Sequence, residues 1–118
     1  MFLQVFSKTT CGYCEAAKRT LSQETHRLKT AGCTVPGAAV IELDDGSLPT
    51  EVAKEVQVVL QRMTGEATVP RVFVDKVLIG GATETVAYAR SGALRMALMK
   101  IGRCVFTDSS LDNNEDSK

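Results

Sequence analysis

The chain has 118 residues, with 14 Lys and Arg against 14 Asp and Glu, and 44% of its residues are hydrophobic. That length fits one compact domain, and the longest apolar runs are far shorter than the roughly 18 residues of a membrane-spanning helix. The formal net charge of zero offers no basic field of the kind that nucleic-acid binders use. We therefore expect neither membrane insertion nor a nucleic-acid partner.

The N-terminal half of the chain predicts two strand–helix units. Residues 1–6 are β-prone and lead through a polar turn into a helix over about 12–30, where Ala, Lys, Arg, Glu and Leu predominate. The short apolar run 38–43, bounded by turn-forming residues, predicts a second strand that is buried on both faces. Apolar residues then recur with helical spacing from Val52 to Met63, and they predict a second helix.

The C-terminal half predicts a hairpin followed by helices. Residues 71–74 and 77–79 are β-prone and are separated by Asp75-Lys76, which is the spacing of a hairpin turn. The helical pattern resumes near Thr83 and continues to about Ile101. The order of elements is thus βα, βα, ββ, αα, with the first two strands parallel through a right-handed crossover.

Two further expectations concern side-chain burial and the end of the chain. Met63, Met96 and Met99 are expected in the core. Residues 107–118 are polar and carry a net charge of −3, whereas residues 1–106 carry +3. We expect residues 1–106 to form the folded domain and residues 107–118 to be an acidic, disordered tail.

The most informative motif is Cys11-Gly12-Tyr13-Cys14, at the junction of the first strand and the first helix. Cys11 falls at the helix N-terminus, where free N–H groups and the helix dipole favour an anion. Such sites lower a cysteine pKa from about 8.5 to roughly 3.5–7.5, which makes the sulfur a nucleophile at neutral pH. Cys14, one turn into the helix, is expected to be covered and to act as the resolving thiol. Lys8 could hold the thiolate or a substrate carboxylate.

The alternative interpretations of this pair are a zinc site and a static disulfide. Tetrahedral zinc normally takes four ligands, and Cys33, His26 and Cys104 show no second pair at ligand spacing. No metal site is therefore predicted, and Cys33 and Cys104 are interpreted as inert single thiols. Few cysteines and the lack of a recognisable leader predict a reducing compartment, and we expect a cytoplasmic protein.

Three segments resemble the glutaredoxin family of the thioredoxin superfamily, and the similarity extends over about residues 5–101. They are Ser-Lys-Thr-Thr-Cys-Gly-Tyr-Cys at 7–14, Thr-Val-Pro-Arg-Val-Phe-Val at 68–74 and Ile-Gly-Gly at 79–81. The resemblance implies an α/β thioredoxin-like fold, in which helices flank a four-stranded mixed sheet.

The resemblance also implies a glutathione site. Pro70 would be a cis-proline that faces the cysteine pair, and the backbone of Val69 would pair with the peptide part of glutathione. The helix N-terminus near Thr83 would receive the γ-glutamyl carboxylate. The positions that match the family's glutathione-binding residues are Lys8, Tyr13, Gln57, Thr68, Val69, Pro70, Gly81, Ala82, Thr83 and Glu84.

The function implied by the resemblance is that of a dithiol glutaredoxin, an enzyme that reduces protein disulfides and glutathione mixed disulfides. Cys11 and Cys14 would be catalytic, and glutathione would be the reductant. The partners would be disulfide or glutathionylated proteins and, through glutathione itself, glutathione reductase. The expected oligomeric state is a monomer.

Two other functions stay open at this point. Many family members have Pro where this chain has Gly12, and Gly there is associated with members that bridge a 2Fe–2S cluster between two subunits. Cys11 would then be a cluster ligand, glutathione an additional one, and the protein a dimeric carrier or sensor. A thioredoxin-like reductase supplied by a flavoenzyme is disfavoured, because the pair encloses no Gly-Pro dipeptide and no Trp precedes it.

Overall fold

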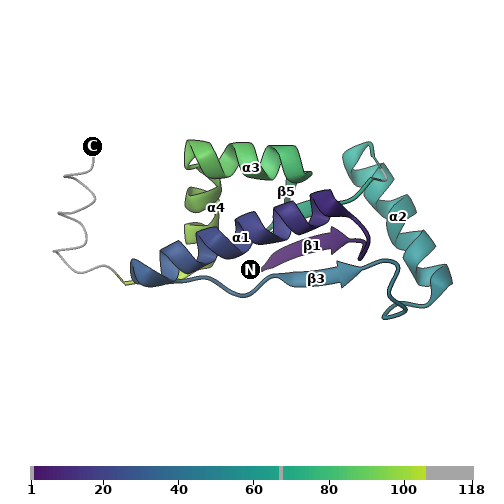
Figure 1. The fold of residues 1–118 in the computed structure, drawn as a ribbon, viewed down its shortest axis with the longest axis horizontal. Helices are drawn as coiled ribbons and strands as arrows, with labels where there is room; N and C mark the ends of the chain where they lie inside the picture. Colours follow the sequence, from purple (N-terminus) through teal and green to yellow (C-terminus); the bar gives the residue numbers. More distant parts are fainter. Residues whose placement is uncertain (1, 67, 106–118) are drawn as a thin grey trace.

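The computed structural model describes residues 2–66 and 68–105. The acidic tail predicted for residues 107–118 lies outside the described residues. In chain order (Figure 1), the elements are β1 (Leu3–Ser7), α1 (Gly12–Thr30), β2 (Cys33–Thr34), β3 (Ala39–Glu42), α2 (Thr50–Thr64), β4 (Arg71–Val74), β5 (Val77–Gly80), α3 (Ala82–Ser91), α4 (Ala93–Ile101) and β6 (Arg103–Cys104). No helix within the described ranges is long and apolar enough to span a membrane.

The main sheet has four strands in the order β3-β1-β4-β5. Strands β1 and β3 are parallel, whereas β4 runs antiparallel to both β1 and β5. The β4–β5 turn has positive φ at both Asp75 (49°) and Lys76 (72°), as the tight hairpin predicted for these residues requires. The predicted four-stranded mixed sheet of a thioredoxin-like fold is therefore confirmed.

The core lies between one face of this sheet and the helices α1, α3 and α4. Leu3 and Val5 of β1 are fully buried and alternate with residues that face the other side of the sheet. They pack with Leu21 of α1 and Leu98 of α4 in one cluster. Helices α1 and α3 run side by side over this face (Figure 1). The buried side chains of the strands, which recur every second residue, thus pack in one layer against those of the helices, which recur every 3.6 residues.

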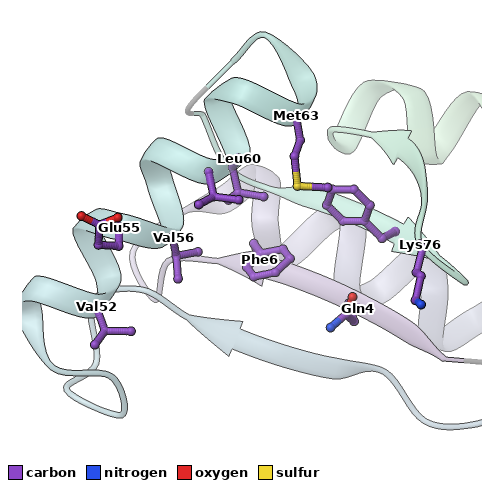
Figure 2. A pocket seen from close by; sticks show the side chains of 10 residues that line it. Gln4, Phe6, Val52, Glu55, Val56, Leu60, Met63 and Lys76 are labelled. Atoms are coloured by element: carbon purple, nitrogen blue, oxygen red, sulfur yellow. The ribbon is translucent and has the colours of Figure 1, made fainter.

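Helix α2 covers the opposite face of the sheet less closely. Val56 and Leu60 of α2 face Phe6 of β1 across an apolar groove of about 450 Å³ (Figure 2), and Phe73 of β4 also lines this groove. The expected burial of two methionines is wrong, because Met63 is 63% exposed at the rim of this groove and Met96 is 66% exposed on α4. Regular helical spacing placed Met63 on the apolar side of α2 without showing how closely that side approaches the sheet.

A second, two-stranded sheet joins β2 to β6 and was not predicted. Cys33 lies opposite Cys104, and the N–H of Val105 donates to the carbonyl of Gly32 at 2.8 Å. The two cysteines therefore form a non-hydrogen-bonded pair, the type in which side chains of antiparallel strands come closest. They are joined by a disulfide. The interpretation of Cys33 and Cys104 as single thiols is wrong. The two cysteines are 71 positions apart in the chain, and the pairing of β2 with β6 brings them together.

Candidate active site at the Cys11–Cys14 turn

Cys11 is the N-cap residue of α1, as the sequence predicts. Its backbone is extended (φ −111°, ψ 111°), and its sulfur accepts a hydrogen bond from the N–H of Cys14 at 3.2 Å. This sulfur therefore sits at the positive end of the helix dipole, among N–H groups that lack partners within the helix. The Cys11 sulfur is thus held at the start of α1 by the N–H of Cys14.

The turn that carries Cys11 is held to the end of β3. Asp44 follows β3 and accepts hydrogen bonds from the backbone N–H of Thr9 at 2.8 Å and from its hydroxyl at 3.1 Å. Because β1 and β3 are parallel, the residues after their carboxyl ends lie at the same edge of the sheet. Asp44 thus anchors the segment from which Cys11 projects.

The two active-site cysteines differ in exposure, and burial changes the acidity of Cys14. Cys11 is partly exposed, whereas Cys14 is fully buried. Burial raises the pKa of the Cys14 thiol above its ordinary value, and its hydrogen bond with Cys11 raises this pKa further. Hydrogen bonds with the backbone of Lys8 and the side chain of Ser7 act in the opposite direction without cancelling the rise. The exposed sulfur is thus placed to react first, and the buried one stays protonated near neutral pH.

The Val69–Pro70 segment lies directly against the reactive sulfur. The peptide bond between these residues is cis, and Sγ of Cys11 is 3.9 Å from the carbonyl oxygen of Val69. The residues are 58 positions apart in the chain, so the approach of β4 to the α1 N-terminus creates this contact. The backbone of Val69 is thereby available beside Cys11.

A hollow of about 200 Å³ extends from Pro70 toward the N-terminus of α3. Eight of the ten predicted glutathione-binding residues line it together with Arg71: Tyr13, Thr68, Val69, Pro70, Gly81, Ala82, Thr83 and Glu84. Lys8 and Gln57 are not among the described residues that line it. The site therefore brings together predicted residues from α1, from the segment before β4 and from the start of α3, whereas Lys8 and Gln57 do not line it.

The turn from β5 into α3 closes one wall of the hollow and contains Gly80 and Gly81. Gly80 has φ +127°, and a Cβ built there would lie 2.8 Å from the Cβ of Glu84. A Cβ at Gly81 would lie 3.3 Å from Oε1 of Glu84 and 3.6 Å from the carbonyl oxygen of Pro70. A side chain at Gly80 would therefore clash with Glu84 in a strained backbone conformation, whereas a Cβ at Gly81 would press only on the end of the Glu84 side chain.

Glu84 plays a part at the α3 N-terminus that the sequence did not reveal. Its carboxylate accepts a hydrogen bond from the N–H of Gly81 at 2.7 Å, so one free donor of the helix end is already satisfied. The N–H groups of the first helical residues, Ala82 and Thr83, follow it in the lining of the hollow. A ligand carboxylate would meet those donors with the Glu84 carboxylate beside them.

Sequence reasoning also missed Arg71. Its side chain is only 8% exposed, and Nη2 donates to the hydroxyl of Thr68 at 2.7 Å and to the carboxylate of Glu66. The one signal in the sequence is that a charged residue opens the otherwise apolar strand Val72-Phe73-Val74. Burial of a guanidinium requires partners, and these partners lie in the loop before the strand.

The apolar groove under α2 is larger than this hollow, but its chemistry differs (Figure 2). Its lining is aliphatic and aromatic except for Gln4, Glu55 and Lys76. No cysteine lines it, whereas the smaller hollow adjoins Cys11 through Val69. Within the described ranges, no three His, Cys, Asp or Glu residues gather as a metal site. The smaller hollow is therefore the candidate active site.

Comparison with known proteins agrees with this assignment. A family model described as Glutaredoxin matches residues 3–79. Human glutaredoxin-1 is 38% identical over 98 residues, which cover 83% of this chain and 82% of that protein. Bovine mitochondrial glutaredoxin-2 is 39% identical over 90 residues, which cover 76% of this chain and 48% of the relative. The chain thus spans about half the length of the mitochondrial relatives that it matches.

Solved structures show the same likeness in three dimensions. The crystal structure of oxidized glutaredoxin 2 from Chlamydomonas reinhardtii superposes with a TM-score of 0.67 at 31% identity, covering 84% of this chain and 80% of that one. A buckwheat glutaredoxin–glutathione complex also gives a TM-score of 0.67, at 33% identity, covering 84% of this chain and 77% of that one.

Proposed function

This chain belongs to the glutaredoxin family, and from that premise we propose that it is a glutathione-dependent thiol–disulfide oxidoreductase. The observation that carries the proposal is the placement of Cys11. Its partly exposed sulfur lies at the N-terminus of α1 and 3.9 Å from the carbonyl oxygen of Val69, beside the hollow. A nucleophile and a peptide-binding backbone thus meet at one place.

In the proposed reaction, the Cys11 thiolate attacks one sulfur of a substrate disulfide. A new S–S bond forms between Cys11 and that sulfur, and the other sulfur leaves as a thiolate that takes up a proton. For a glutathione mixed disulfide, the protein thiol leaves and Cys11 carries glutathione. A second glutathione thiolate then attacks the glutathione sulfur, which releases glutathione disulfide and regenerates Cys11.

For a protein disulfide, Cys14 resolves the intermediate. The Cys14 thiol loses its proton and attacks Sγ of Cys11, which releases the substrate as a dithiol and leaves a Cys11–Cys14 disulfide. Two glutathione molecules reduce that disulfide and become glutathione disulfide. Because burial raises the pKa of Cys14, its thiolate is scarce at neutral pH, and this route is expected to be the slower one.

The binding of glutathione is proposed to use backbone groups. The N–H and C=O of Val69 would pair with the tripeptide as a strand does, and the free N–H groups at the start of α3 would hold its γ-glutamyl carboxylate. The buckwheat glutaredoxin of similar fold is described in complex with glutathione, which supports this assignment. Lys8 lies outside the lining of the hollow, so no contact with glutathione is assigned to it in this proposal.

The proposed partners are disulfide-containing and glutathionylated proteins, with glutathione reductase coupled through glutathione disulfide. The proposed setting is the cytoplasm, and the proposed active form is a monomer. The partners are proposed from the use of free glutathione as reductant, and the setting stays a proposal from the sequence because several of the matched relatives are mitochondrial.

The test is reduction of a small glutathione mixed disulfide, coupled to glutathione reductase and NADPH. We expect turnover by the wild type, loss of turnover in Cys11→Ser, and retained turnover in Cys14→Ser. With a protein disulfide as substrate, Cys14→Ser should lose activity too. Equal loss in both variants on the mixed disulfide would contradict the assigned roles, and no wild-type turnover would refute the proposed enzyme.

A second candidate function is a dimer bridged by a 2Fe–2S cluster, and the surroundings of Gly12 favour it. Apart from its chain neighbours and its own helix backbone, a Cβ built at Gly12 would meet no atom within 4 Å, so this position next to Cys11 faces open space. Cys11 is partly exposed and Cys14 is buried, so each chain would offer one thiolate, with glutathione thiols completing the ligands. Iron content, visible absorption and dimeric elution after reconstitution with glutathione test it, and a colourless monomer would exclude it.

A further inference from the structure

Arg71 occupies an unusual place for a charged residue. It is the first residue of β4, directly after Pro70, and it lies opposite Phe6 in the β1–β4 ladder. Directly opposed residues of antiparallel strands point to the same face of the sheet, so Arg71 enters the layer beneath α2. Its Nε is buried and has no hydrogen-bond partner among the described residues. Such a costly arrangement calls for a compensating role.

The guanidinium of Arg71 reaches both walls of the hollow. On one side, Nη2 binds the hydroxyl of Thr68 at 2.7 Å and the carboxylate of Glu66. On the other side, Nη1 lies 3.7 Å from the point where a Cβ of Gly81 would be. Thr68 begins the segment proposed to pair with glutathione, and Gly81 begins the turn into α3. The planar guanidinium thus lies between the Thr68–Val69 segment and Gly81, the two segments proposed to bind glutathione.

We propose that Arg71, held in place by Glu66, is a positioning residue that sets the spacing between the Thr68–Val69 segment and Gly81. It thereby controls how tightly the glutathionyl group is bound. This inference rests on the proposed function. Arg71 would act through the Thr68 hydroxyl that it binds and through its place beside Gly81, and the Cys11 thiolate would carry out the chemistry without it.

The positive charge of Arg71 is already paired with a carboxylate of the protein. The Glu66 carboxylate neutralises the guanidinium, and the 8% exposure of the Arg71 side chain leaves little of it open to a ligand. The Glu66 side chain is 64% exposed, so its removal would not open the core. If Arg71 instead bound a glutathione carboxylate directly, removal of Glu66 would free the guanidinium and improve binding. The two roles therefore predict opposite effects of one substitution.

The experiment compares the steady-state kinetics of wild type, Arg71→Met, Glu66→Ala and the double variant on a glutathionylated peptide. Arg71→Met removes charge-assisted hydrogen bonds, and we expect KM to rise about tenfold with kcat nearly unchanged. Glu66→Ala should raise KM in the same direction by a smaller factor. The double variant should resemble Arg71→Met alone, because Glu66 acts only through Arg71. Arg27→Met, which removes an exposed arginine on α1 away from the hollow, is the matched control and should leave KM unchanged.

Three kinetic outcomes would overturn the proposal. KM unchanged or lowered in Glu66→Ala would assign Arg71 a direct contact with the ligand. If the rise in KM in the double variant equals the product of the rises in the two single variants, Arg71 and Glu66 act independently. A fall in kcat at constant KM would place Arg71 in the chemical step. Because Glu66 is exposed, its variant is expected to fold even if Arg71→Met does not.

Amide hydrogen exchange on the ligand-free variants separates this proposal from the proposed function. We expect faster exchange in peptides that cover residues 66–70 and 80–84 of both single variants, with no change in peptides from α1. If the wild type lacks glutathione-dependent activity, the proposed function fails and exchange alone decides the positioning role. Unchanged exchange in those two segments would overturn that role whatever the activity.

Discussion

The disulfide between Cys33 and Cys104 should account for a large share of the stability of the oxidised protein. The two residues are 71 positions apart, so the bond closes a loop through more than half of the chain. By loop-closure entropy, a cross-link of this span destabilises the unfolded chain by about 4 kcal/mol. That value is a considerable part of the roughly 5–15 kcal/mol that stabilises a typical domain. The loss of stability on reduction of this disulfide should therefore be readily measured.

The assay is urea unfolding of one protein in its oxidised and reduced forms. The background is Cys11→Ser/Cys14→Ser, so that Cys33–Cys104 is the one disulfide that oxidation can form. With a denaturant slope of about 2 kcal/mol per molar urea, the unfolding midpoint should fall by roughly 2 M on reduction. A further Cys104→Ser change gives the matched control, whose midpoint should not respond to reductant.

The reasoning is refuted by a specific pair of results. Mass spectrometry of the oxidised protein must show the Cys33–Cys104 linkage, and its absence would refute the pairing itself. If the bond is present and the two midpoints agree within about 0.3 M, constraint of the unfolded chain does not stabilise this protein. A midpoint that rises on reduction would show that the bond distorts the native β2–β6 contact.

Three further predictions concern the core and the active site. Leu98→Ala should lower the free energy of unfolding by about 3 kcal/mol in urea titrations, because Leu98 is fully buried, and a loss below about 1 kcal/mol would contradict that placement. Glu24→Leu should leave that free energy unchanged or raise it by about 1 kcal/mol. Among the described residues, the buried Glu24 carboxylate accepts no hydrogen bond and is paired with Arg27 and Arg95 at 3.6 and 3.5 Å. A clear loss of stability would show that these ion pairs stabilise the fold. Since the folded state raises the pKa of Cys14, its protonated thiol favours folding below the ordinary thiol pKa, and this contribution should be lost as pH rises through the raised value. The reduced protein should thus lose more thermal stability than Cys14→Ala between pH 7 and 10, and parallel curves would contradict the shift.

The sequence by itself determined the features that depend on near neighbours in the chain. Period-two and helical spacing predicted β1, α1, α2 and the β4–β5 hairpin, and the two residues Asp75-Lys76 already specified a tight turn. The position of Cys11 at a helix N-terminus follows from the same local pattern, since the cap and the helix are contiguous. Chemistry that arises within one turn of the chain can be inferred from the order of residues.

Only the tertiary structure decided the features that join distant segments. The Cys33–Cys104 bond, the burial of Arg71 behind Glu66 and Thr68, and the absence of Lys8 and Gln57 from the hollow's described lining all depend on how the layers pack. Residue type and periodicity show which face of an element is apolar. They do not show how closely that face approaches its neighbour or which side chain meets it, because those distances are settled by contacts among many residues at once.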